Sequence, residues 1–485
     1  MILKRQKAYA CFGIGLSLST TPALPSPFHQ KPLSYDSVES IDGCFPLSGL
    51  PSSSPSDNSP YVPRIDYAAV DEGDDGSTPS PDSMTLYPLH ISGSREERVN
   101  LMFFSDGYTV GEEGKFVKDA SKLKDDIVSH KGAMSHVAHL LNVWATFVPS
   151  NASGIGSHDK PLEDAAFGLY RPGAELRAVF VNNPRRARAA CRWFRENKAK
   201  QGGCDQPILL GNDPLYGGLG GEFTVITASE LNGPIVLRHE LGHSIIDVGE
   251  EYDGGYAYFG VNSDTYKQGE ALKWREFLTN PERLRIEDAR VSLQVYPPNL
   301  EYSWHDLGIS SWAISFNSSN LVSHQNGDLH YPTALLRASL SSIPHSSHIS
   351  LVLNGHILDL ADGFPKAWEG SLDRRWLEVP LILGTGLQPG RNTIKVALTD
   401  EGKKAKAGQG GKMIASLEII EYGGDGRFNH TEGFIGAFPT YAMDGRVRLR
   451  PTNEGCLMRK VNHPTFCPIC AHYLEKRLED IIRNR

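Results

Sequence analysis

One segment, PIVLRHELGHSIID at residues 234–247, constrains the fold of this chain more than any other feature. It is a largely apolar run in which His239 and His243 stand one helical turn apart, so that both lie on one face of a helix. Two imidazoles placed in this way can bind one Zn²⁺, and Glu240 beside the first can accept a proton from a water on the metal. The pattern alone is only moderately specific, and a core helix that merely carries histidines is the alternative. It therefore predicts a buried helix with a metal site, provided that a further ligand lies nearby.

The residues after this helix offer that further ligand. A catalytic zinc site needs a third protein ligand and an open position for water. Gly249 can end the helix, because glycine tolerates the left-handed conformation at a helix C-terminus, and acidic residues follow it at once. Glu250 is the first candidate, Glu251 its close rival and Glu270 a more distant one, whereas Asp247 is better placed to support a ligand than to bind. Two imidazoles and one carboxylate favour one zinc ion, although a solvated acidic turn is the plainer reading of EEYD.

A glycine-rich segment at residues 217–221 precedes the helix and leads into a predicted strand at 223–228. Glycines there permit the close approach of another backbone. If that strand is a free edge beside the metal, an extended peptide could pair with it by strand addition, as proteolysis requires. A flexible loop that feeds a buried strand is the alternative.

The first residues predict export. Residues 1–23 place three basic side chains ahead of an apolar stretch at 8–18, which is the layout of a secretory signal peptide, although a buried N-terminal strand is the alternative. That stretch is shorter than the roughly 20 residues that a bilayer span needs, and no other segment reaches that length, so we expect a secreted, extracellular protein without a membrane span. A net charge of −8 and the lack of a basic run argue against a nucleic-acid partner. Sequons at Asn151, Asn317 and Asn429 fit a glycoprotein.

The cysteines fit the same compartment. Seven are present, and removal of Cys11 with the signal peptide leaves six, an even number that suits disulfides. Cys191 and Cys204 close a short loop and form the expected local pair. The other four allow three pairings that the sequence cannot separate, and the alternative is a structural zinc site in which the last three act with His472. These four are Cys44, Cys456, Cys467 and Cys470.

The composition and the hydrophobic pattern of the chain change along its length. Residues 24–85 are rich in Ser, Pro and Asp and predict a linker or prosegment. Residues 86–284 alternate strand and helix patterns, which predicts an α/β layer with a twisted sheet. Residues 285–422 show short alternating segments and an Asn-Gly turn at 354–355, which predict an all-β sandwich insertion. Residues 423–485 would complete the first domain. The expected strands of that domain are 99–104, 143–148, 176–181 and 223–228, and its expected helices start near 115 and span 185–198.

Several separated segments resemble the clostridial-type IgA peptidase family of zinc metallopeptidases, a group with metzincin-like character. They are FFSDGYT at 103–109, the helix from Lys115, NVWATFVPSNASG at 142–154, HELGHSIIDVGEEY at 239–252, KW at 273–274, and RLRPTNEGCLMR with FCPIC at 448–470. The ordered set is far more specific than H-E-x-x-H alone.

This resemblance implies a zincin-like α/β (α+β) fold with His239 and His243 as zinc ligands, Glu240 as general base and an acidic third ligand at the position of Glu250. Met458 would be similar to the methionine turn below a metzincin zinc site. Two features depart from the pattern: the usual third histidine of metzincins would fall at Gly249, and the acidic residue common in the family is Asp where this chain has Glu. The residues at about 285–422 have no counterpart in the shorter bacterial members.

The sequence thus predicts a secreted zinc endopeptidase that acts on proteins or peptides, with Tyr252 and Tyr441 as candidate oxyanion stabilisers. The competing hypothesis is a secreted binding or adhesion protein. In that case the β-sandwich would hold a glycan or protein, and the zinc site would be structural or inactive.

Overall fold

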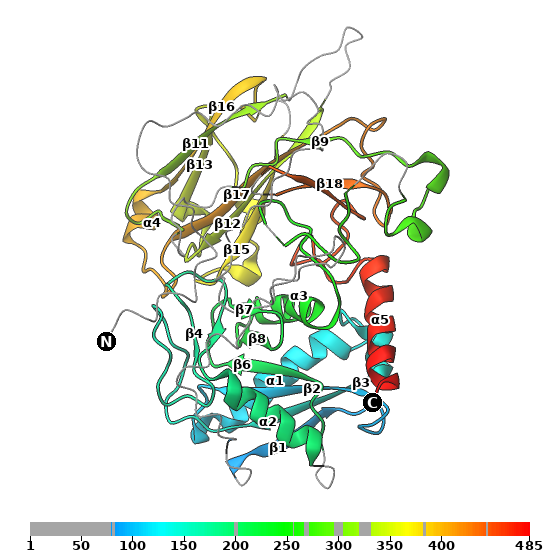
Figure 1. Cartoon of the computed structure of the whole chain (residues 1–485). Coiled ribbons are helices and arrows are strands. Elements are labelled where there is room, and N and C mark those ends of the chain that lie inside the picture. The colour runs from blue at the N-terminus through cyan, green and yellow to red at the C-terminus, as the bar shows by residue number, and fades with distance from the viewer. Residues whose placement is uncertain are drawn as a thin grey trace, which may run out of the picture.

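The computed structural model describes most of the chain after residue 82. The predicted signal peptide at 1–23 lies outside the described residues, as do nearly all of the predicted linker, Cys44 and Glu270. The described residues are 79, 83–197, 202–255, 257–265, 271–294, 304–319, 331–381, 385–442 and 445–485. They form a mixed α/β structure with several sheets and few helices (Figure 1).

A six-stranded sheet organises the first part of the chain. Its order is β1-β3-β2-β6-β8-β7; the four inner strands run parallel, and an antiparallel strand closes each edge. The strands are β1 (Thr85–His90), β2 (Val99–Asp106), β3 (Leu141–Phe147), β6 (Gln206–Gly211), β7 (Gly218–Leu219) and β8 (Thr224–Thr227).

Helices cover both faces of this sheet, as the parallel arrangement requires. Every residue of β2 is buried, and alternate side chains point to opposite faces. Leu101 and Phe103 enter one core with α1, α3 and α5, whereas Met102 and Phe104 enter another with α2. The helices are α1 (Glu113–Val128), α2 (Pro184–Glu196), α3 (Gly233–Ile245) and α5 (Pro468–Arg483). The C-terminal helix α5 therefore returns to the sheet that the N-terminal strands began (Figure 1).

Cys191 on α2 and Cys204 ahead of β6 form a disulfide, which confirms the predicted local pair. Two pairs of short antiparallel strands lie outside this sheet. They are β4 (Leu169–Tyr170) with β5 (Phe180–Val181), and β18 (Phe438–Tyr441) with β19 (Val447–Arg450).

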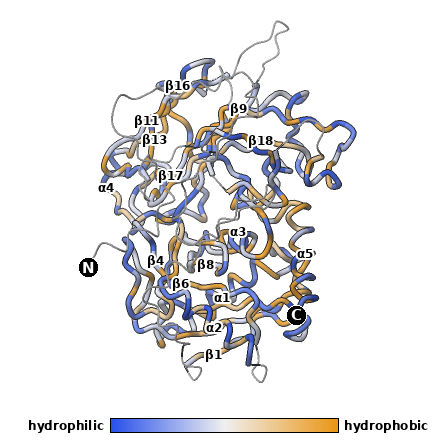
Figure 2. Tube along the Cα trace, in the orientation of Figure 1, coloured by the Kyte–Doolittle hydropathy of each residue, from blue (hydrophilic) through white to orange (hydrophobic). Residues whose placement is uncertain are grey.

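Two further antiparallel sheets lie above this region in Figure 1. One has the order β10-β17-β12-β15 with β9 also on β17, and the other has the order β11-β16-β13-β14. Both contribute side chains to one apolar core, for example Leu336 from β12 and Leu351 from β13. In Figure 2 the strands and the inner faces of the helices are largely apolar, and the outer loops are largely polar. The strands are β9 (Ala289–Arg290), β10 (His305–Asp306), β11 (Trp312–Ser318), β12 (Thr333–Ser341), β13 (Ile349–Leu353), β14 (His356–Ile357), β15 (Arg375–Leu381), β16 (Gly390–Leu398) and β17 (Met413–Tyr422), with a short helix α4 (Asp400–Lys404).

Some predicted elements need correction. The strand expected at 176–181 is reduced to Phe180–Val181, and the inner strand β6 at Gln206–Gly211 was not predicted. A short apolar run bounded by turn residues does not show by periodicity alone whether it is a strand, and this explains both errors. The Asn-Gly hairpin is confirmed, because Asn354 and Gly355 have φ values of 50° and 89° between β13 and β14.

A buried network of charges joins the upper sheets to the rest of the molecule. The fully buried guanidinium of Arg459 contacts Asp253 at 2.8 Å, Glu418 of β17 at 3.2 Å and Glu454 at 3.1 Å. Arg337 of β12 contacts the same Glu418 and Glu454, at 3.1 and 2.6 Å. Segments that are far apart in sequence are therefore held together a few residues away from the predicted metal ligands.

Candidate metal centre

Helix α3 presents the two histidines of the H-E-x-x-H segment. Its apolar residues Val236, Leu237 and Leu241 are buried in the core with α1 and α5, which fixes the rotation of the helix. His239 and His243 then point to the same place, with their Nε2 atoms 3.3 Å apart and their rings nearly perpendicular.

The chain turns back after α3 and brings Glu250 to these rings. One carboxylate oxygen lies 3.1 Å from His243 Nε2 and the other 3.2 Å from His239 Nε2. The helix ends at Ile245, not at Gly249 as predicted. Gly249 is needed for another reason: a Cβ there would lie 2.5 Å from the carbonyl oxygen of Ala257, so only glycine permits the approach of that segment.

The hydrogen bonds of the two imidazoles show what the site can hold. His239 Nδ1 lies 3.1 Å from the carbonyl of Leu457, and His243 Nδ1 lies 3.1 Å from that of Val248. A carbonyl oxygen can only accept, so each Nδ1 carries a proton, and each ring in its neutral form turns the lone pair of Nε2 toward Glu250. Three acceptors that face one another require either a proton or a metal ion between them. Ligands at about 2.0–2.1 Å from a tetrahedral zinc stand roughly 3.3–3.4 Å apart, so the observed spacings fit that ion.

The electrostatics of the cluster favour the same cation. Burial alone would raise the pKa of Glu250, but the charges of His243 and His239 hold it well below its usual range. Burial would likewise lower the pKa of His239, but Glu250 and Glu240 raise it to about 9. A proton therefore competes for the place of a metal between these groups, and metal binding would release it.

Glu240 lies beside these ligands on α3. Burial raises its pKa, and the positive charges of His239 and His243 oppose that shift. The backbone of Gly220 hydrogen-bonds to its carboxylate. A Cβ at Gly220 would lie 2.8 Å from His243 Cβ and 3.1 Å from a Glu240 carboxylate oxygen, so the glycine-rich segment crosses the site in contact with α3. Its strand β7 is the outermost strand of the six-stranded sheet among the described residues.

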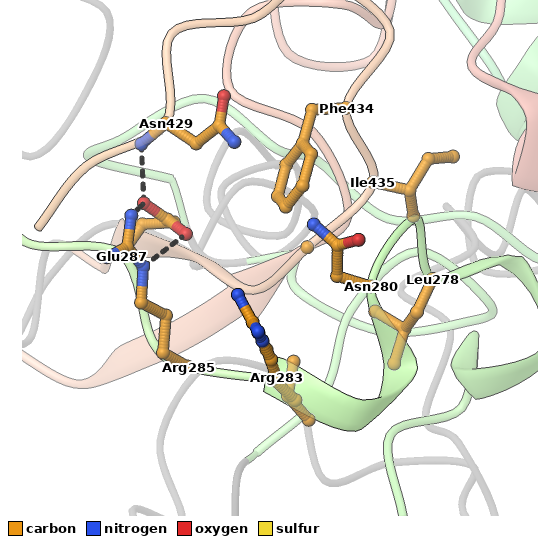
Figure 3. Close-up of a pocket in the computed structure, with 10 residues that line it drawn as sticks. Leu278, Asn280, Arg283, Arg285, Glu287, Asn429, Phe434 and Ile435 are labelled. Carbon is orange, nitrogen blue, oxygen red and sulfur yellow. Dashed lines mark hydrogen bonds and ion pairs between the residues drawn. The ribbon is translucent and has the colours of Figure 1, made fainter. Parts of the chain in front are cut away.

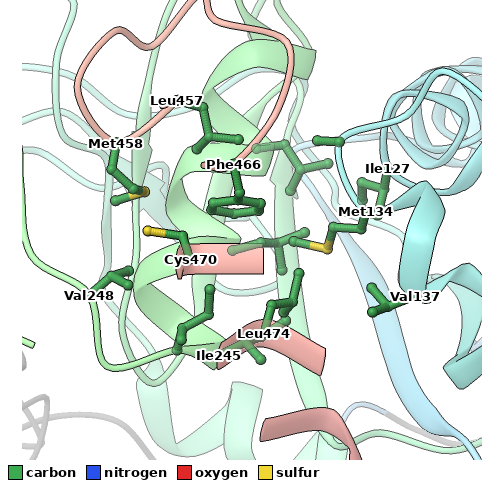
Figure 4. Close-up of a cluster of buried hydrophobic side chains, with 14 of the residues drawn as sticks. Ile127, Met134, Val137, Ile245, Val248, Leu457, Met458, Phe466, Cys470 and Leu474 are labelled. Atoms are coloured by element: carbon green, nitrogen blue, oxygen red, sulfur yellow. The ribbon is translucent and has the colours of Figure 1, made fainter. Parts of the chain in front are cut away.

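The C-terminal segment packs against α3, and Figure 4 shows Met458 and Phe466 in the apolar cluster beside this helix. Met458 and Phe466 pack under α3 where Gly242 leaves room: a Cβ there would lie 3.1 Å from the Met458 sulfur and 3.0 Å from the Phe466 ring. The Met458 carbonyl accepts a hydrogen bond from the backbone of Glu251. Both supporting contacts to the histidines come from backbone carbonyls. Asp247, which we expected in that role, is exposed.

Among the other predicted candidates, Glu251 and Tyr441 have partners other than the histidines. The Glu251 carboxylate is fully buried among three cysteines and accepts a hydrogen bond from Asn262 at 2.9 Å. Glu270 lies outside the described residues. The Tyr441 hydroxyl donates to the carbonyl of Ala289, which makes it unsuited to an oxyanion role. Tyr252 is half-buried.

Tyr216 is a residue that the sequence reasoning missed. Burial raises its pKa to about 12; Arg374 opposes the shift, and the negative charges of Glu240 and Glu250 add to it. The Arg374 guanidinium lies 4.8 Å from its ring centre. The phenol thus stays protonated at neutral pH, and the effect of Glu240 and Glu250 on its pKa shows that it lies near the candidate centre. In the sequence, only its position one residue before the glycine-rich segment indicated that Tyr216 could lie near the site.

Two cavities lined by described residues lie elsewhere. One, of about 200 Å³, is bordered by Arg285, Glu287 and Asn429, where the Glu287 carboxylate accepts from the Asn429 backbone at 2.5 Å (Figure 3). The other, of about 390 Å³, is formed by loops around residues 430–433 and 452–464. Neither is lined by a predicted metal ligand.

Comparison with known proteins supports a peptidase. Residues 87–289 match the model of the IgA Peptidase M64 family, which confirms the family resemblance and indicates a metallopeptidase. No curated protein matches the chain.

Some solved structures are also similar over a short stretch. One is a β-porphyranase of glycoside hydrolase family 86 from the gut bacterium Bacteroides plebeius, with 18% identity over 27% of this chain and 20% of that one, and a TM-score of 0.19. Two structures of the enzyme BuGH86 in complex with neoagarooctaose share 20% identity over 27% of this chain and 18% of theirs, with a TM-score of 0.18. The matched part is thus about a fifth of those chains, and the TM-scores are too low to bear on fold or function.

Proposed function

Because residues 87–289 match the IgA peptidase family, we propose that this protein is a secreted, zinc-dependent endopeptidase with Glu240 as general base. In this proposal His239, His243 and Glu250 hold one catalytic Zn²⁺. The observation that carries it is the convergence of two imidazole Nε2 atoms and one carboxylate within 3.1 to 3.3 Å of one another. Three protein ligands leave a fourth position for water, as a catalytic zinc requires.

The residues around the ligands supply the remaining chemistry. A bound Zn²⁺ would polarise the scissile carbonyl and lower the pKa of a water molecule. Glu240 would accept the proton of the attacking water on a carboxylate oxygen and return it to the leaving amine. This carboxylate is half-buried, and the hydrogen bond with the backbone of Gly220 holds it in place. Tyr216 would donate its phenol hydrogen to the oxygen that becomes negative during attack.

Strand β7 would bind the substrate. Its outer edge has no strand partner among the described residues, and it lies against α3 at Glu240. An extended peptide that pairs with this edge would bring its backbone past the metal ligands. Main-chain pairing gives affinity for many sequences, and pockets for alternate side chains give preference.

The fold and location belong to the same proposal. Residues 86–284 and 423–485 would form a zincin-like catalytic domain, with residues 285–422 as a β-sandwich inserted between its two parts. The shared apolar core of the two antiparallel sheets supports this division. Residues 1–23 would direct export, and 24–85 would be a linker or prosegment.

The alternative function is a secreted binding protein in which the inserted β region holds a glycan or protein. It predicts bound metal without turnover. The placement of Glu240 beside the metal ligands favours the peptidase, because a purely structural site has no use for a half-buried carboxylate that does not bind the ion.

The deciding experiment is hydrolysis of an unfolded protein substrate by the purified protein, by the chelated and zinc-restored protein, and by Glu240→Gln. We expect chelation to abolish cleavage and zinc to restore it, while Glu240→Gln keeps its zinc and loses activity. Asp247→Asn, at an exposed position just after α3, is the matched control and should cleave normally. Stoichiometric zinc without cleavage, even after removal of the first 80 or so residues, would favour the binding protein.

A further inference from the structure

A second group of potential ligands lies outside the candidate catalytic centre. Glu251, Cys456, Cys467 and Cys470 come from separated segments, and one ligand atom from each lies within 4.8 Å of all the others. All four residues are buried, and the three cysteines form no disulfide. The sequence suggested His472 as the fourth member; it is exposed and packs against the Phe277 ring instead.

The carboxylate of Glu251 points to a missing positive charge. The side chain is 0% exposed, and one of its oxygens has no hydrogen-bond partner. The other oxygen accepts from the uncharged amide of Asn262, and the Cys456 thiol also lies within hydrogen-bonding reach of the carboxyl group. Arg450 acts on this group electrostatically, but no described residue forms a direct ion pair with it. A buried carboxylate without a paired cation is strongly unfavourable, so this group calls for a cation that protein side chains do not supply.

The cysteines have the spacing of metal ligands. Cys456 and Cys470 have their sulfurs 3.9 Å apart. Thiolates at about 2.3 Å from a tetrahedral zinc stand roughly 3.8 Å apart, whereas a disulfide would require about 2.05 Å. Three clustered cysteines also cannot all pair with one another.

The local backbone favours thiolates in this place. Cys467 and Cys470 form a C-P-I-C sequence at the start of α5, where Cys467 is the N-cap. The positive end of a helix stabilises a thiolate. The backbone N–H of Cys467 also points at the Cys456 sulfur, 3.4 Å away.

We propose that Glu251, Cys456, Cys467 and Cys470 bind a second Zn²⁺, which is structural. Three thiolates and one carboxylate give a closed four-ligand site with no open position, so this ion would not take part in hydrolysis. The proposal does not depend on the catalytic function of the histidine centre.

Such an ion would stabilise the candidate catalytic centre through residues that adjoin it in sequence. Glu251 directly follows the ligand Glu250, and Cys456 directly precedes Leu457, whose carbonyl orients His239. One ion would thus fix the residue next to Glu250 and the residue next to Leu457. It would thereby hold both the proposed third zinc ligand and the carbonyl that orients His239.

Metal analysis of the purified full-length protein tests this proposal. We expect two zinc equivalents in the wild type and one in His243→Ala, which disrupts only the histidine centre. Cobalt replaces zinc with a readout specific for sulfur: a near-ultraviolet thiolate-to-cobalt charge-transfer band should appear in the wild type and persist in His243→Ala. A histidine and carboxylate centre cannot give that band.

Alkylation and mass mapping test the thiols independently, without a variant that could fail to fold. After chelation under denaturing conditions, all three cysteines should be alkylated, while Cys191 and Cys204 remain linked. A disulfide that involves any of the three, or one zinc equivalent without the cobalt band, would overturn the proposal. Failure of the peptidase function would appear separately, as two bound metals without hydrolysis.

Discussion

Gly220→Ala is the change that most directly tests whether β7 positions the substrate beside helix α3. The added Cβ would lie 2.8 Å from His243 Cβ and 2.8 Å from the backbone oxygen of Glu240. Ordinary contact begins at about 3.4 Å, so β7 or α3 must move by about 0.6 Å, which is 3.4 minus 2.8. The backbone of α3 is held by its buried core, so we expect β7 to move.

The magnitude follows from the geometry. A displacement of about 1 Å at a substrate-positioning element can cost roughly 10²-fold in rate, so 0.6 Å should cost on the order of tenfold in kcat/KM. Initial rates on an unfolded protein substrate measure it, with zinc content and thermal unfolding recorded on the same samples. Zinc should stay stoichiometric, because no ligand changes.

Gly114→Ala provides the control. It lies on α1, and a Cβ there meets nothing within 4 Å. Alanine is the better helix former by up to about 1 kcal/mol, so this variant should keep its activity and unfold at the same or a higher temperature. Full activity of Gly220→Ala with normal zinc would refute the idea that β7 positions substrate over Glu240.

Three other predictions follow from the charges of the site. Glu250→Gln should weaken zinc binding by more than about 100-fold, which is the upper range for loss of a residue that only supports a ligand. Competition with a chelator measures this affinity, and an affinity equal to that of Asp247→Asn would contradict the role of Glu250 as a ligand. Tyr216→Phe should lower kcat at unchanged zinc content and little changed KM, because the phenol is expected to act on the transition state; a change in KM alone would argue for a packing role. Burial would raise the pKa of Glu454, but Arg459 and Arg337 lower it from 4.5 to about 2, so its share of stability is complete above pH 4.5 and is lost as the pH falls toward 2. Glu454→Gln should therefore show a shallower loss of thermal stability across that acid range, and a slope equal to that of the wild type would show that this carboxylate is not paired in solution.

Local patterns in the sequence were sufficient for the elements that depend on neighbouring residues. The helix with His239 and His243, the Cys191–Cys204 pair and the Asn-Gly hairpin all follow from spacing within a few residues or a short loop. The strand β6 could not be predicted in this way. Its six residues show no hydrophobic periodicity that distinguishes a strand from another kind of buried segment.

The supporting parts of the site could not be predicted, because they depend on contacts between distant segments. The backbone carbonyl of Leu457 accepts a hydrogen bond from His239, which lies 218 positions earlier in the sequence. Every residue type has such a carbonyl, so the sequence cannot reveal this contact. The sequence also could not separate Glu250 from its neighbour as a ligand. Adjacent residues in extended chain point to opposite sides, and the structure directs Glu250 to the histidines and Glu251 to the cysteines.

The buried charges suggest why the inserted β region is joined to the candidate site. Arg459 follows Met458 in the C-terminal segment, and it contacts both Asp253, three residues after Glu250, and Glu418 on β17. Removal of one partner from a buried ion pair typically costs about 3–5 kcal/mol, because the remaining charge is left without compensation. Arg459 is shared by three carboxylates, so a shift of β17 would leave part of this network uncompensated. The position of the loop that carries Glu250 is therefore coupled energetically to the upper sheets, and these sheets support the candidate metal centre structurally whether or not they bind a partner.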